Sequence, residues 1–81
     1  MELDNKVCVV TGGASGIGAA TCRAFAAKGA RVVVTDINMA GARQVAEEIG
    51  GLAIACDVSE EAEVNNLVAE SEKQLGPIDL F

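Results

Sequence analysis

The segment Thr11–Gly18, with the sequence Thr-Gly-Gly-Ala-Ser-Gly-Ile-Gly, is the part of the chain whose residue types are best suited to chemistry. It follows the apolar run Val7–Val10 and opens a helical pattern that reaches Lys28. Glycines lack a Cβ atom, so such a turn can adopt positive φ and let the backbone approach a ligand closely. The first N–H groups of the helix then face an anion, which the helix dipole also favours. The segment predicts a phosphate-binding turn, with an ordinary strand-to-helix glycine turn as the alternative.

The spacing of the glycines separates this turn from two related ones. A P-loop requires Lys-Ser or Lys-Thr after its last glycine, but Gly18 is followed by alanines. The fingerprint Gly-x-Gly-x-x-Gly fails because Thr21 occupies the last glycine position. The remaining pattern, Thr-Gly-x-x-x-Gly-Ile-Gly, resembles the cofactor loop of the short-chain dehydrogenase/reductase family. The cofactor-binding candidates in this turn are Gly12, Ser15, Gly16, Ile17 and Gly18.

Within this turn, Ser15 is expected to offer a hydroxyl near the pyrophosphate and its riboses, and Ile17 a backbone N–H. The side chain of Ile17 could also belong to the core, and the two roles are compatible. It would then share one side of the expected first helix with Thr21, Ala24, Phe25 and Lys28.

Asp36 ends an apolar run whose core is Val32–Val34 and lies 18 positions after Gly18. A carboxylate there can accept hydrogen bonds from the adenosine ribose hydroxyls, and it would repel the 2′-phosphate of NADP. Ser15 and Ile37 stand where the resembling family often carries a basic residue. We therefore predict NAD rather than NADP, and count Asp36 and Ile37 among the cofactor-binding residues. The alternative is that Asp36 only caps a helix.

Asp57 and Val58 follow the next apolar run. The resemblance implies that an Asp-Val pair at this point contacts the adenine ring. A carboxylate can accept from the exocyclic amine, and the next backbone N–H can donate to a ring nitrogen. The alternative is that Asp57 helps to start the following helix.

Strands and helices alternate along the chain, which predicts an α/β fold with a parallel sheet. The resemblance implies the N-terminal part of a three-layer Rossmann-type domain, β-α-β-α-β-α-β, with strand order 3-2-1-4. The first two helices would then lie on one face and the third on the other. The expected strands are about Lys6–Thr11, Arg31–Asp36, Leu52–Cys56 and Ile78–Phe81. The expected helices are about Gly16–Lys28, Met39–Ile49 capped by Asn38, and a third that starts at a Ser59 cap and ends at Gly76-Pro77.

Composition excludes several function classes. The net charge is -6, and no basic side chain occurs between Glu47 and Glu72, which disfavours nucleic acids and anionic membranes as partners. No apolar run is long enough to span a bilayer. The chain contains three cysteines, Cys8, Cys22 and Cys56, and their spacing is not that of metal ligands. We therefore expect buried free thiols and no metal site. Free thiols in turn favour a cytoplasmic location.

The resemblance runs through the whole chain but covers only about the first third of a typical family member. The family's later Ser and Tyr-x-x-x-Lys set lies beyond this stretch, and the chain contains no Tyr. We expect residues 1–81 to be part of a single NAD-binding domain, truncated within the fourth strand, with no catalytic residue and no turnover alone. The parent would move hydride between nicotinamide and a small alcohol or carbonyl substrate, and the exposed edge could favour homo-oligomers. A stand-alone NAD-binding module and a non-catalytic interaction fragment are the alternatives.

Overall fold

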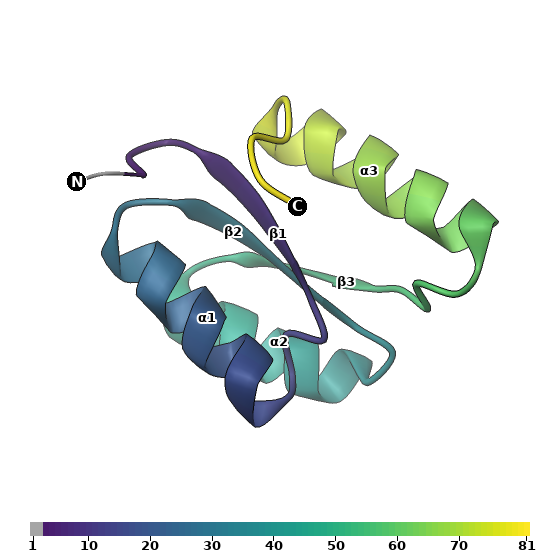
Figure 1. Ribbon diagram of the computed structural model, residues 1–81, viewed down its shortest axis with the longest axis horizontal. Coiled ribbons are helices and arrows are strands. Elements are labelled where there is room, and N and C mark those ends of the chain that lie inside the picture. Colours follow the sequence, from purple (N-terminus) through teal and green to yellow (C-terminus); the bar gives the residue numbers. More distant parts are fainter. Residues whose placement is uncertain (1–2) are drawn as a thin grey trace.

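A computed structural model describes residues 3–81 as a three-stranded parallel sheet between two layers of helices (Figure 1). The elements in chain order are β1 Val7–Thr11, α1 Gly16–Ala27, β2 Arg31–Asp36, α2 Met39–Ile49, β3 Leu52–Ala55 and α3 Glu61–Leu75. In Figure 1, α1 and α2 lie on one face of the sheet, and α3 lies on the other. This arrangement confirms the expected Rossmann-type α/β architecture. No helix within residues 3–81 has both the length and the apolar character needed to cross a membrane.

The strand order places β2 in the centre, with β1 and β3 on either side. Val9 pairs with Val33, and Thr35 pairs with Ile54, so both ladders run parallel to β2. The predicted double-sided burial of Val32–Val34 is confirmed, because all three side chains are buried. The carboxyl ends of all three strands therefore lie along one edge of the sheet.

Alternate residues of the strands fill two separate cores. Val10, Val32 and Val34 pack under α1 and α2 against small side chains, namely Ala19, Cys22, Ala42, Val45 and Ala46. Val9 and Val33 pack on the opposite face, where α3 contributes Leu67 and the loop after β3 contributes Cys56. Small residues on α1 and α2 let these helices lie close to the sheet.

The buried side of α1 differs from the expected one. Gly18, Ala19 and Cys22 are its buried residues, whereas the side chain of Ile17 is 85% exposed. The expected buried side was based on the larger apolar side chains of the helix. The small residues of α1 instead make the contact with the strands. Ile17 consequently projects from the end of the helix that adjoins the glycine-rich turn.

Two helix starts test the expected caps. Asn38 caps α2 as expected, since its side chain accepts a hydrogen bond from the N–H of Gly41 at 3.1 Å. The predicted Ser59 cap of α3 is wrong, because the N-cap is Glu60 and makes no side-chain hydrogen bond. Ser59 instead donates its hydroxyl to Asp57 Oδ1 at 2.7 Å.

Residues 78–81 continue the sheet on the free side of β1, as the order 3-2-1-4 requires. The segment does not form the full strand expected for Ile78–Phe81, since it makes only one parallel bridge, Cys8 with Leu80. The N–H of Val9 donates to the carbonyl of Leu80 at 2.9 Å, and the carboxylate of Asp79 accepts from the N–H of Val7 at 2.8 Å. An acidic side chain therefore takes one of the ladder positions.

Candidate functional site

The glycine-rich turn between β1 and α1 closes on itself through Ser15. The Ser15 hydroxyl accepts a hydrogen bond from the N–H of Gly18 at 3.1 Å, which makes Ser15 the N-cap of α1. The same hydroxyl donates to the carbonyl of Gly12 at 2.8 Å. Gly12 has φ +67°, a conformation that favours glycine. A Cβ atom on Gly18 would overlap the carbonyl of Gly12, so the turn requires glycine at both positions.

The turn leaves donors and space on its outer side. Within the described residues, the N–H groups of Gly16 and Ile17, at the start of α1, have no intramolecular acceptor. Cβ atoms built on Gly12 and Gly16 would meet no atom within 4 Å. Free N–H groups at a helix start, next to open space, form a cradle for an anion.

The turn is fixed to the end of β2 by two backbone donors. The N–H of Gly13 donates to the carbonyl of Thr35 at 2.9 Å, and the N–H of Ala14 donates to Asp36 Oδ2 at 3.0 Å. A Cβ on Gly13 would lie 2.6 Å from Val34 Cγ1, so the backbone there lies directly on the strand. The sequence did not single out Gly13 or Ala14, because their partners lie far along the chain.

Asp36 holds two elements at once. Its Oδ2 accepts from Ala14, and its Oδ1 accepts from the N–H of Asn38 at 3.0 Å. The N-cap of α2 is Asn38, so Asp36 does not itself cap this helix. A carboxylate has about four lone-pair sites, so each oxygen of Asp36 retains one acceptor position.

A shallow pocket of about 150 Å³ opens between the ends of β1, β2 and β3, lined by Gly12, Asp36, Ile37, Cys56 and Val58. Four of these residues are sequence-predicted cofactor residues. The side chains of Ile37 and Val58 are 71% and 56% exposed, so two apolar groups face solvent at its rim. Cys56 was missed as a lining residue, although its place directly before Asp57 at the end of an apolar run could have indicated it.

The thiol of Cys56 is buried, and this burial raises its pKa. The nearby carboxylates of Glu63 and Asp57 raise the pKa of Cys56 further. Cys8 and Cys22 are also buried free thiols whose pKa burial raises, so the expectation of buried free cysteines is confirmed. Cys56 therefore contributes a neutral, weakly polar surface to the pocket.

Asp57 lies beside this pocket but is not among its lining residues. Its Oδ1 accepts from both the hydroxyl and the N–H of Ser59, at 2.7 and 3.0 Å. The hydrogen bond from the Ser59 hydroxyl is the main cause that lowers the pKa of Asp57. The N–H of Asp57 donates to Glu63 of α3 at 2.9 Å. These bonds shape the loop that leads into α3, which is the alternative role considered for Asp57.

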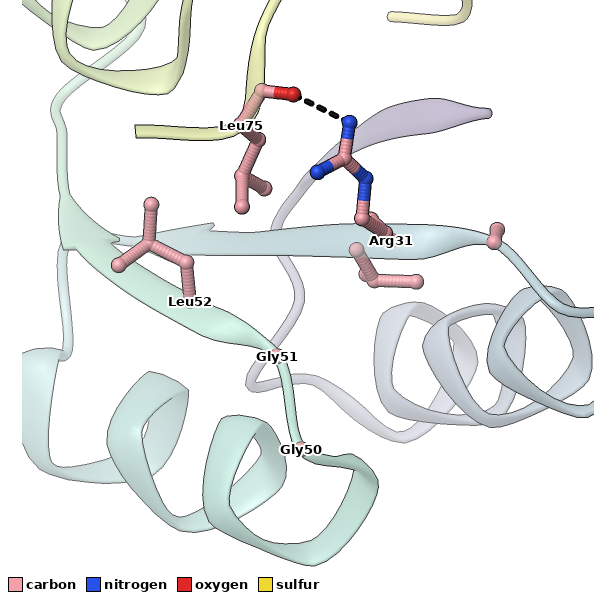
Figure 2. A pocket seen from close by; sticks show the side chains of 7 residues that line it. Arg31, Gly50, Gly51, Leu52 and Leu75 are labelled. Atoms are coloured by element: carbon pink, nitrogen blue, oxygen red, sulfur yellow. Dashed lines mark hydrogen bonds between the residues drawn. The ribbon is translucent and has the colours of Figure 1, made fainter. Parts of the chain in front are cut away.

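A larger hollow, of about 280 Å³, lies at the opposite edge of the sheet (Figure 2). Its lining is mostly apolar and comprises Ala30, Arg31, Val32, Gly50, Gly51, Leu52 and Leu75. The guanidinium of Arg31 donates to the carbonyl of Leu75, as the dashed line in Figure 2 marks. The C-terminal ends of α2 and α3 lie here, and helix C-termini disfavour anions.

The parallel sheet with helices on both faces and the glycine-rich turn after β1 define a Rossmann-type α/β architecture. Residues 6–81 match the model of the short chain dehydrogenase family. The chain belongs to this family, which confirms the resemblance seen in its glycine pattern.

Similar proteins include the sorbitol dehydrogenase of Cereibacter sphaeroides, at 45% identity over 100% of this chain and 32% of the relative. The solved structure of a hydroxysteroid dehydrogenase from Escherichia coli has a TM-score of 0.94 and 38% identity over 98% of this chain and 35% of that one. That of a 3-ketoacyl-(acyl-carrier-protein) reductase from Brucella melitensis, complexed with NADH, has a TM-score of 0.91 and 41% identity, covering 95% and 33% of the two chains. The chain thus spans about a third of the length of these relatives.

Proposed function

We propose that residues 1–81 are the NAD-binding segment of an NAD-dependent oxidoreductase that transfers hydride between nicotinamide and an alcohol or carbonyl substrate. The segment would form the N-terminal part of one Rossmann domain and hold the ADP half of the cofactor. The observation that carries the proposal is the position of Asp36, whose carboxylate fixes the glycine-rich turn while keeping free acceptor positions beside the pocket.

The pyrophosphate fits the outer side of the turn. The N–H groups of Gly16 and Ile17 are the donors, and the open space at Gly12 and Gly16 gives the phosphates room to approach the backbone. Ser15 closes the turn and would lie near the adjacent ribose. The chain's net charge of -6 gives no general attraction to an anion, so binding depends on these local donors.

The adenosine half fits the pocket between the strand ends. Each Asp36 oxygen has one acceptor position left, which suits the two ribose hydroxyls of NAD. A 2′-phosphate would bring a second negative charge against this carboxylate, and Ile37 supplies no compensating cation. The exposed side chains of Ile37 and Val58 would flank the adenine ring, with Asp57 close to its edge.

The bound dinucleotide would supply the hydride-transfer chemistry. The chain's own residues would bind and orient the cofactor, and none of them is proposed as a catalytic acid or base. The chain contains no His and no Tyr, so we expect no alcohol oxidation by these 81 residues alone.

Calorimetric titration of the chain with NAD, NADP and ADP-ribose tests the proposal. We expect NAD and ADP-ribose to bind, and NADP to bind about tenfold or more weakly, which corresponds to about 1.4 kcal/mol. ADP-ribose lacks the nicotinamide, so its binding isolates the half of the cofactor that this segment would hold. Absence of binding by all three ligands at millimolar concentration would overturn the proposal and favour a non-binding fragment. Equal binding of NAD and NADP would overturn the proposed preference.

A further inference from the structure

The first turn of α2 lies so close to the glycine-rich turn that a side chain at position 41 would not fit without a shift. A Cβ atom on Gly41 would lie 2.8 Å from the Cβ of Ala14 and 2.8 Å from Nδ2 of Asn38. Real Cβ atoms rarely come this close to another atom, so an alanine at position 41 would push Ala14 or the helix away. Gly41 is the third residue of α2, where glycine is a poorer helix former than alanine. Its presence is therefore explained by the close contacts with Ala14 and the Asn38 side chain rather than by helix propensity.

Ala14 connects this contact to the groups that face the ligand. Its N–H donates to Asp36 Oδ2 at 3.0 Å, and it directly precedes Ser15, the N-cap of α1. The free N–H groups of Gly16 and Ile17 come next along the chain. A displacement of Ala14 would therefore move the donors of the cradle and lengthen the bond to Asp36.

Asp36 also connects to Gly41 through Asn38. Its Oδ1 accepts from the N–H of Asn38, and Asn38 in turn accepts from the N–H of Gly41 at 3.1 Å. A single carboxylate thus bonds both the turn and the start of α2, which is possible only while the two elements remain in contact.

We propose that Gly41 is a positioning residue for the glycine-rich turn, because its lack of a Cβ lets α2 press on Ala14 and keep the cradle donors in place. The expected effect of Gly41 on ligand affinity rests on the proposed dinucleotide function. Its expected effect on the position of the glycine-rich turn is independent of that function.

The test compares the whole chain with Gly41→Ala, Ala14→Gly and the double variant. We expect Gly41→Ala to weaken ADP binding roughly three- to tenfold, as overpacking in a fixed contact does. In the Ala14→Gly background the same substitution should have a clearly smaller effect, because the opposing Cβ is gone. Any remaining effect would come from Asn38, whose side-chain amide also faces position 41.

Ala40→Gly is the matched control, because Ala40 is exposed in the same helical turn. It should lower the melting temperature through its poor helix propensity and leave the Kd for ADP unchanged. If Gly41 affected only helix stability, Gly41→Ala would raise the melting temperature and leave the Kd for ADP unchanged. Unchanged ADP affinity in Gly41→Ala, or an equal loss in both Ala14 backgrounds, would overturn the proposal.

Amide hydrogen exchange at residue 14, measured without ligand, separates this proposal from the proposed function. Gly41→Ala should speed exchange there by weakening the bond to Asp36, and the same substitution should speed it clearly less in the Ala14→Gly background. If the wild-type chain binds no ADP, the dinucleotide function fails and the exchange data alone decide the positioning role. Unaltered exchange in Gly41→Ala would refute it.

Discussion

Ala14 and Asp36 lie 22 positions apart in the sequence, yet the N–H of Ala14 donates to the Asp36 carboxylate at 3.0 Å. This bond joins the turn that follows β1 to the end of β2. The same carboxylate lines the pocket between the strand ends. Asp36 therefore belongs both to the structure of the site and to its proposed ligand-binding surface.

Replacing Asp36 with alanine should affect stability and cofactor choice together. Two backbone donors lose their acceptor, which should cost about 1–3 kcal/mol of unfolding free energy in urea melts. Loss of the ribose acceptors should weaken NAD binding about tenfold or more, while NADP gains from the removal of a like charge. The NAD-to-NADP affinity ratio should fall. Glu47→Ala, which removes an equal charge from the exposed side of α2, should leave the ratio unchanged. An unaltered ratio in Asp36→Ala would contradict the ribose role.

Alanine at Gly16 and at Gly18 should give different results. Space is open at Gly16, and its φ is not positive, so Gly16→Ala should change stability by no more than about 0.5 kcal/mol. Its methyl group would enter the proposed pyrophosphate space and weaken NAD binding. Gly18→Ala meets the backbone of Gly12 and should lose about 1–3 kcal/mol of stability as well as affinity. Paired urea melts and calorimetry measure both. Full NAD affinity in Gly16→Ala would place the pyrophosphate elsewhere.

Local patterns predicted most of the fold, because strand, turn and helix signals lie close together in the chain. The glycine-rich turn and the Asn38 cap are such signals. Four of the predicted candidates line the pocket between the strand ends. The sequence did not indicate Cys56 as a pocket residue or Gly41 as a contact of the turn, since these roles depend on elements distant in the sequence. The buried side of α1 was misassigned because periodicity gives weight to large apolar residues, whereas Gly18, Ala19 and Cys22 make the contact.

Arg31 should stabilise the end of α3. Its guanidinium donates to the carbonyl of Leu75 in the last turn of that helix, where positive charge is favoured. Arg31→Ala should therefore lower the free energy of unfolding by about 1 kcal/mol. Arg43→Ala, at an exposed position on α2, removes the same charge and should change it by less than about 0.5 kcal/mol. Equal losses in the two variants would show that net charge, rather than this hydrogen bond, is responsible.

Ser59 should set the titration of Asp57. The Ser59 hydroxyl lowers the pKa of Asp57 in the folded chain. The ionised carboxylate therefore stabilises the folded chain fully at pH values above the pKa that Asp57 has in the unfolded chain. This stabilisation is lost as the pH falls through the lower folded value. Ser59→Ala should raise the folded pKa toward its ordinary value, as followed by NMR of the Asp57 carboxyl carbon. An identical titration curve in both proteins would exclude this hydrogen bond in solution.

The hydrogen bonds from the glycine-rich turn to the end of β2 also determine how a bound ligand would affect local opening of the sheet. Thr35 and Asp36 hold the turn, and they directly follow the buried core of the central strand. A ligand that binds only the folded state suppresses every opening that separates β1 from β2, by an amount that grows with its concentration. The buried amides of Val32–Val34, which exchange only through such openings, would then gain protection as the ligand concentration rises. Binding at the glycine-rich turn would thus be coupled to the opening of the central strand through these two hydrogen bonds.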